Sequence, residues 1–93
     1  MRIIGYIDHS FLKVTVFQMD TRITVKFETP EFEQSYKFRM PDQLNHLEDV
    51  QRLVDNEFIE MVLDNMKAQN RTKAQAMDRF IQEDTAEEFD TII

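Results

Sequence analysis

The chain has 93 residues, of which 42% are hydrophobic and 31% are charged, and its formal net charge is −7. This is the composition of a folded globular domain and not of a disordered chain. Because the sequence contains no cysteine, disulfide bonds, thiolate metal sites and thiol nucleophiles are excluded. No apolar run reaches the length of a membrane span and no N-terminal signal pattern is present, so we expect a cytoplasmic protein without membrane contact.

The charge is distributed unevenly along the chain. Residues 1–39 hold six Lys and Arg against five Asp and Glu, which gives +1. Residues 40–93 hold five against thirteen, which gives −8. A negative total is unfavourable for nucleic-acid binding, whose affinity comes mainly from neutralised phosphates, so we expect nucleic acid to be a less favoured partner than protein.

The first 39 residues alternate apolar and polar side chains with a period near two, as β-strands do. We predict four strands, over residues 2–7, 11–19, 22–28 and 33–39. Asp8-His9-Ser10, Asp20-Thr21 and Thr29-Pro30-Glu31 separate them with residue types that favour turns. Because connections this short join only antiparallel neighbours, the strands should form a meander sheet.

After Pro41 the apolar spacing changes to three and four, which predicts helices. Asn45 followed by Glu48 resembles a capping box and predicts a helix start. One apolar stripe then predicts a long amphipathic helix over the sheet, formed by Leu47, Val50, Leu53, Val54, Phe58, Met61, Val62 and Met66. The stripe lapses at residues 68–72, where we expect a break, with one continuous helix as the alternative. A shorter C-terminal helix would resume it at Ala74, Met77, Phe80 and Ile81.

These patterns predict an α+β fold with two layers: a four-stranded antiparallel meander sheet, one long amphipathic helix and a shorter C-terminal helix. Residues 1–84 should form a single domain. Residues 85–93 form an acidic tail, which is either loose or capped into a last short helix by Thr85 and Glu88.

Three groups of residues have side chains of the types that catalysis or metal binding requires. Asp8, His9 and Ser10 are the residue types of a hydrolase triad, but triads are assembled from residues distant in sequence, so we interpret them as a hairpin turn. His9 and His46 are candidate metal ligands without a supporting spacing, so we expect no metal site and no cofactor.

Glu57, Glu60 and Asp64 form the third group, with helical spacings of three and four, and are able to share one helix face. Paired carboxylates of this kind serve as a catalytic acid and base or as cation ligands. We favour the plainer interpretation, the solvated outer face of an amphipathic helix, and expect no enzymatic activity.

Alternation along the strands predicts a polar sheet face on which basic side chains surround an aromatic ring. This candidate interaction face consists of Lys13, Phe17, Arg22, Lys26, Lys37 and Arg39. Such a face suits single-stranded nucleic acid, whose bases stack on aromatics while cations follow the phosphates. It equally suits an acidic helix, or it is a solvated face whose cations balance Glu28 and Glu33 across strands.

The sequence predicts a non-enzymatic protein-interaction module that forms a homodimer, because six Met and eight Phe offer more apolar surface than one helix layer buries. The acidic helical half of one chain, or its tail, would meet the basic sheet face of another. The alternative is single-stranded nucleic-acid binding on that sheet face.

Overall fold

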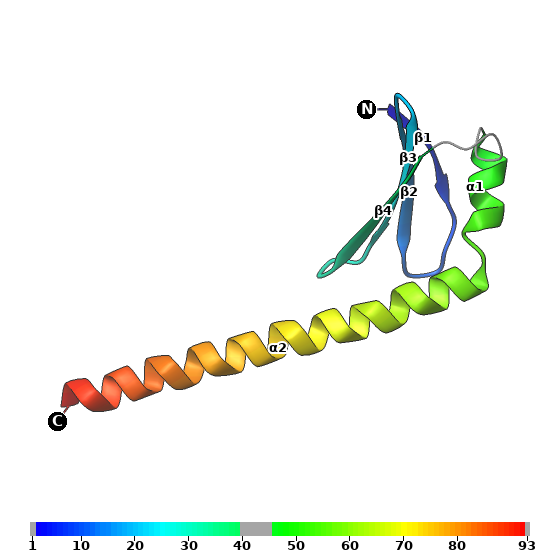
Figure 1. The fold of residues 1–93 in the computed structure, drawn as a ribbon. Coiled ribbons are helices and arrows are strands. Elements are labelled where there is room, and N and C mark those ends of the chain that lie inside the picture. Colours follow the sequence, from blue (N-terminus) through cyan, green and yellow to red (C-terminus); the bar gives the residue numbers. More distant parts are fainter. Residues whose placement is uncertain (1, 40–45, 93) are drawn as a thin grey trace.

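The computed structural model of the chain describes the backbone of residues 2–39 and 46–92, and the side chains of these residues up to Glu83. The four strands are β1 (Arg2–Ile7), β2 (Lys13–Met19), β3 (Arg22–Glu28) and β4 (Glu33–Arg39). They pair in sequence order, and every pair is antiparallel. The predicted four-stranded meander is therefore confirmed (Figure 1).

Each hairpin turn is stabilised by the residue types that predicted it. The Nδ1 atom of His9 accepts a hydrogen bond from the N–H of Leu12 at 3.3 Å. Asp20 adopts a φ of 49°, a left-handed conformation that Asp tolerates in tight hairpins. The hydroxyl of Thr29 accepts the N–H of Phe32 at 3.0 Å. The turns thus depend on contacts within a few residues.

Two helices follow the sheet, α1 (Leu47–Leu53) and α2 (Asn56–Ile92). The short helix precedes the long one, so the predicted helix order is wrong. The predicted break at residues 68–72 is also wrong, because α2 is continuous there. No Gly or Pro interrupts that segment, and the Thr72 hydroxyl donates to the carbonyl of Ala68 at 3.0 Å, within the helix.

The actual break lies at Val54 and Asp55, inside the stretch predicted as one long helix. Val54 leaves the helical conformation, with φ −85° and ψ 71°, while its N–H still donates to Val50 at 2.9 Å. The Asp55 carboxylate accepts the N–H of Phe58 at 2.9 Å, and the Asp55 carbonyl accepts that of Ile59 at 3.1 Å. Asp55 therefore caps the N-terminus of α2.

The start of α1 differs from the predicted capping box by one residue. The N-cap is His46, whose N–H donates to the Asp49 carboxylate at 3.2 Å, while the N–H of Asp49 donates to the His46 carbonyl at 3.0 Å. Asn45 lies outside the described residues. The carboxylate in the first turn has the predicted purpose, but it belongs to Asp49 and not to Glu48.

The core lies between one face of the sheet and a cover formed by α1 and the first part of α2. Its buried members are Leu12, Val14, Val16, Ile23, Val25, Phe27, Val50, Val54, Val62 and Met66. The Phe27 ring lies 6.0 Å from Tyr36 and 5.2 Å from Phe58, so β3, β4 and α2 meet in one aromatic cluster. The Gln34 amide donates to the carbonyl of Val62 at 2.7 Å and joins β4 to the helix.

The sole glycine permits a close approach of α1 to the sheet. A Cβ atom at Gly5 would lie 2.5 Å from Cδ2 of Leu47, the first residue of α1. Gly5 also follows a β-bulge in the pairing of β1 with β2. The absence of a side chain on β1 therefore leaves room for Leu47.

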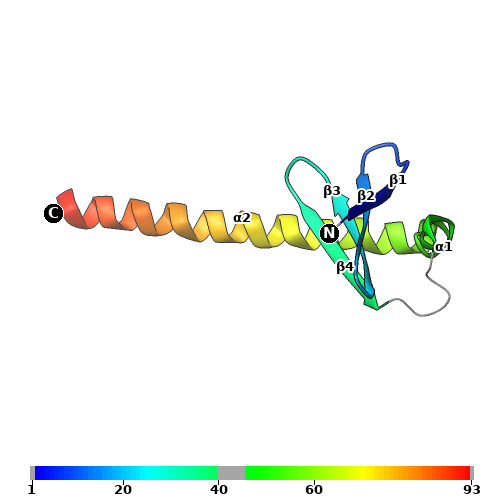
Figure 2. The same ribbon diagram turned by 90° about the horizontal axis from the view of Figure 1, so that it is seen from above.

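Most of α2 extends away from this body (Figures 1 and 2). The chain measures 67 × 26 × 18 Å, with a radius of gyration of 19.2 Å. A compact chain of this length would have a radius of gyration of about 12 Å. Every residue from Asn70 to Glu83 is exposed. We refer to α2 from Asn70 onward as the projecting segment.

Replacing the cap of α2 tests the origin of the helix break. Asp55→Ala removes the acceptor for the Phe58 N–H, so we expect the free energy of unfolding to fall by about 1 kcal/mol in urea denaturation followed by circular dichroism. Asp64→Ala is the control, because Asp64 is exposed and forms only a 3.9 Å pair with Lys67. Equal losses in both variants would contradict the capping role.

Candidate interaction surfaces

One face of the sheet carries the predicted candidate interaction face. Residues directly opposite each other in antiparallel strands share a face. Lys13 lies opposite Glu28, Arg22 lies opposite both Met19 and Arg39, and the remaining members follow the same alternation. The register thus places all six on the face away from the core: Lys13, Phe17, Arg22, Lys26, Lys37 and Arg39. We refer to this surface as the open face.

The open face is more apolar than alternation predicts, because of β1. Ile3 lies opposite Phe17 and Tyr6 lies opposite Thr15, since the bulge between Ile3 and Gly5 shifts the register. A strict period of two would have turned one of these two side chains toward the core. Ile3 is 49% exposed and Tyr6 is 55% exposed. They extend the apolar area around Phe17. The adjacent apolar residues Ile3 and Ile4 and the glycine that follows them interrupt the alternation of β1, and they are the sequence signal of the bulge.

The charges at one end of the open face are balanced. The Lys26 ammonium lies 3.2 Å from the Glu33 carboxylate and 3.7 Å from that of Glu28. The hydrogen bond with Glu33, and then the attraction of Glu28, raise the pKa of Lys26 above its ordinary value. At this end the cations pair across strands, as expected for a solvated face.

The other end of the open face is basic. Arg22 and Arg39 lie directly opposite each other, and Lys37 is two residues from Arg39 on the same strand. Within the described part of the chain, none of the three has an acidic group within 4.0 Å. Like charges placed opposite each other are destabilising, so this end favours an anionic partner.

A groove runs over the open face and connects its apolar and charged parts. Its lining consists of Phe17, Met19, Arg22, Thr24, Lys26, Glu33, Ser35 and Lys37. Basic groups beside the Phe17 ring and the Met19 thioether suit a ligand with an anionic group and an apolar or aromatic part.

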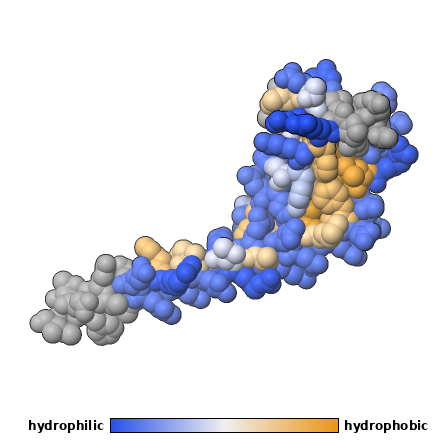
Figure 3. Space-filling view, in the orientation of Figure 1, coloured by the Kyte–Doolittle hydropathy of each residue, from blue (hydrophilic) through white to orange (hydrophobic). Residues whose placement is uncertain are grey.

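The projecting segment presents a second apolar surface. Met77, Phe80 and Ile81 are 51%, 63% and 54% exposed. At about 100° per residue they lie on the helix face that carries Val62 and Met66 in the core. Figure 3 shows apolar atoms along one side of the helix beyond the sheet. We refer to Met77, Phe80 and Ile81 as the distal stripe.

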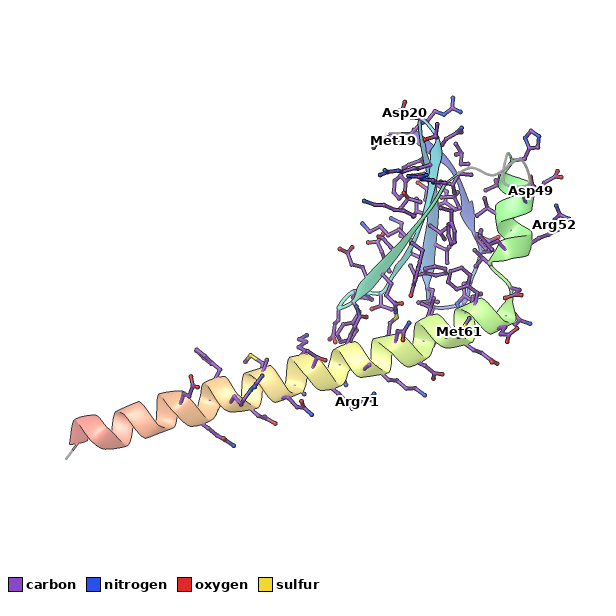
Figure 4. All side chains as sticks on the ribbon, in the orientation of Figure 1. Met19, Asp20, Asp49, Arg52, Met61 and Arg71 are labelled. Atoms are coloured by element: carbon purple, nitrogen blue, oxygen red, sulfur yellow. The ribbon has the colours of Figure 1, made fainter. Side chains whose placement is uncertain are left out.

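The distal stripe continues the core face of α2 past the edge of the sheet. Gln69 and Lys73 are the last residues of that face to reach the body. The Gln69 amide donates to the Glu33 carbonyl at 3.0 Å, and the Lys73 ammonium lies 5.5 Å from the centre of the Phe32 ring. Beyond Lys73 the side chains of the same face are exposed as far as the described residues extend (Figure 4).

Asp8, His9 and Ser10 form a turn and are not arranged as a triad. The His9 ring packs edge-on against Phe11, with 4.7 Å between centroids, and its Nδ1 atom accepts backbone N–H groups. Within the residues that the structure describes, no three His, Asp or Glu side chains are grouped to hold a metal ion.

The three candidate carboxylates near the start of α2, those of Glu57, Glu60 and Asp64, are exposed. Glu60 and Asp64 border an open hollow with an apolar floor that includes Phe11 and Phe32, whereas Glu57 does not line it. Asp64 faces Lys67 at 3.9 Å. The structure therefore brings two of the three carboxylates to one open surface.

Comparison with protein-family models, curated proteins and solved structures finds no match to this chain. Among the described helices, none is both long and apolar enough to span a membrane. The open face and the projecting segment are therefore the surfaces from which a function can be inferred.

Charge reversal on the open face tests the repulsion at its basic end. Arg39→Glu places an acid opposite Arg22, so we expect a gain of about 0.5 kcal/mol in the free energy of unfolding at low salt. Lys13→Glu is the matched control, because it places an acid opposite Glu28 and should lower that free energy by a similar amount. Denaturant unfolding of both variants measures the difference, and a loss for Arg39→Glu would contradict the repulsion.

Proposed function

We propose that the chain is a non-enzymatic protein-interaction module that works as a homodimer. The observation that carries this proposal is the distal stripe. Single exposed apolar side chains are ordinary, but three large ones on one face of a helix that leaves the body mark a contact surface.

The stability of the projecting segment supports the same proposal. Helices in proteins gain most of their stability by packing an amphipathic face against another element, and short isolated helices are marginal in water. The 14 residues from Asn70 to Glu83 are all exposed, and among them only Lys73 is seen against the described part of the sheet, over the Phe32 ring, so the segment gains little packing there. A partner that covers the distal stripe would supply it.

The charge distribution favours a second copy of the chain as that partner. The chain carries both a basic surface, at Arg22, Lys37 and Arg39, and an acidic region, which holds six acids and one Arg between Asp78 and Asp90. Two copies would offer complementary potentials to each other, and this complementarity selects partners more than it adds affinity.

Light scattering during size-exclusion chromatography measures the mass of the particle. We expect a dimer, and we expect Phe80→Ser to raise its dissociation constant about tenfold or more. Phe11→Ser is the control, because Phe11 is 62% exposed against 63% for Phe80 and lies outside the projecting segment. A monomeric wild-type chain at every concentration, or equal weakening by both substitutions, would contradict the proposal.

A second candidate function is single-stranded nucleic-acid binding on the open face. The observation that favours it is a group of cations, Arg22, Lys37 and Arg39, which have no acidic neighbour among the described residues and lie near the half-buried Phe17 ring. Cations that follow phosphates and rings that stack on bases make up single-strand platforms. The net charge of −7 opposes it, so it ranks second.

Fluorescence anisotropy with a labelled single-stranded oligonucleotide tests this second function. If it is correct, affinity falls steeply as salt rises, and Lys37→Glu combined with Arg39→Glu reduces it at least about tenfold. The control is Lys13→Glu, at the balanced end of the open face, which should have a smaller effect. Affinity that is absent, or that does not depend on salt, would eliminate the function.

A further inference from the structure

The projecting part of α2 is electrically polarised along its axis. The sequence from Lys67 to Lys73 holds three basic residues and no acidic one, whereas Asp78 to Asp90 holds six acidic residues and one basic residue. The helix is continuous through both stretches. Lys67 and Lys73 face Asp64 and Glu31 at 3.9 and 4.0 Å, and exposed pairs of this length contribute little. The basic stretch is therefore open to a stronger anionic neighbour.

The distal stripe lies near the middle of the projecting segment, which begins at Asn70 and whose helix ends at Ile92. These 23 residues extend about 34 Å at 1.5 Å per residue, the length of roughly three heptads. Asn70, Ala74, Met77 and Ile81 follow the alternating spacing of four and three that places residues on one helix–helix contact line. Phe80 flanks that line.

We propose that two copies of the chain pair through antiparallel α2 helices, with a two-fold axis close to residues 79 and 80. This inference rests on the homodimer proposed above and identifies its contact surface. In this arrangement Met77 of each copy packs against Ile81 of the other. Such a contact uses the same surface twice and closes at two copies.

The charges select the antiparallel direction. With the axis near residue 79, residues 70–73 of one copy lie beside residues 85–88 of the other. The basic stretch of each helix then lies along the acidic stretch of its partner. A parallel pair would place six acidic residues of one chain beside the same six of the other, and such repulsion costs stability along the whole contact.

The sheet also limits how far two α2 helices can lie along each other, and this limit favours a similar register. The hairpin between β3 and β4 covers the core face of α2 as far as Gln69 and Lys73. Every described side chain from Asn70 to Glu83 is exposed, so a partner helix can approach α2 along this segment. Full overlap of two segments that run from Asn70 to Ile92 would place the axis at residue 81, two residues from the position that the charges favour, and the distal stripes still meet near the centre.

Disulfide cross-linking tests the direction of pairing. Because the sequence contains no cysteine, every thiol in the experiment is one that was introduced. Met77→Cys and Ile81→Cys are prepared separately, checked for folding by circular dichroism, and equilibrated in a glutathione redox buffer alone and mixed. Both sites are about half exposed, so neither substitution opens the core. Antiparallel pairing brings the thiol of the Met77→Cys variant near the thiol of the Ile81→Cys variant, within reach of a disulfide. We expect covalent dimers in the mixture and few in either variant alone.

Each other outcome has a distinct meaning. Covalent dimers in both separate variants indicate parallel pairing, which overturns the antiparallel inference and leaves the homodimer standing. A covalent dimer in only one of the separate variants places an antiparallel axis at that residue and overturns the proposed register. A dimer by light scattering with no cross-link in any sample also overturns the inference. A cross-link between Phe17→Cys and Ile81→Cys would then place α2 on the open face of the second copy. A monomer by light scattering overturns both the inference and the proposed function.

Discussion

The hydrogen bond between the Asp55 carboxylate and the N–H of Phe58 is the contact on which the arrangement of the helices depends. It lets the chain end one helix at Leu53 and begin another at Asn56, at a different angle. The bend allows two short helical surfaces to cover the sheet: α1 against β1 beside Gly5, and the start of α2 against β3 and β4. It also sets the direction in which the rest of α2 leaves the body.

The strands were predictable because the forces that define them are local or periodic. Alternation of Ile23, Val25 and Phe27 with polar residues identifies β3, and residues such as Asp20 and Thr29 identify the turns. The helix break was not predictable from periodicity, because Asp55 sits within an apolar stripe that continues on both sides. One capping hydrogen bond, worth about 1 kcal/mol, decides between one helix and two there.

Alternation along β2, β3 and β4 predicted which of their residues lie on the open face. It did not predict which of the charges on that face are neutralised. Which cations are neutralised depends on the strand register: Lys26 lies between Glu28 and Glu33, whereas Arg22 lies opposite Arg39. The bulge in β1 adds Tyr6 and Ile3 to the same face, and its sequence signals are Gly5 and the adjacent apolar pair before it. The distal stripe was identified as an apolar helix face, yet a sequence pattern identifies such a face without identifying what covers it.

The separation of α2 into a packed start and a projecting segment divides its backbone amides into two populations. We expect amides between Phe58 and Met66 to exchange with solvent deuterium only when the core opens, because Val62 and Met66 are buried with the sheet. Amides beyond Asn70 in an unpaired chain report only the local helix–coil equilibrium, and they should exchange orders of magnitude faster. We therefore expect one uninterrupted helix to span two regimes of local stability, and its outer half to gain the protection of the packed start only when a partner binds it.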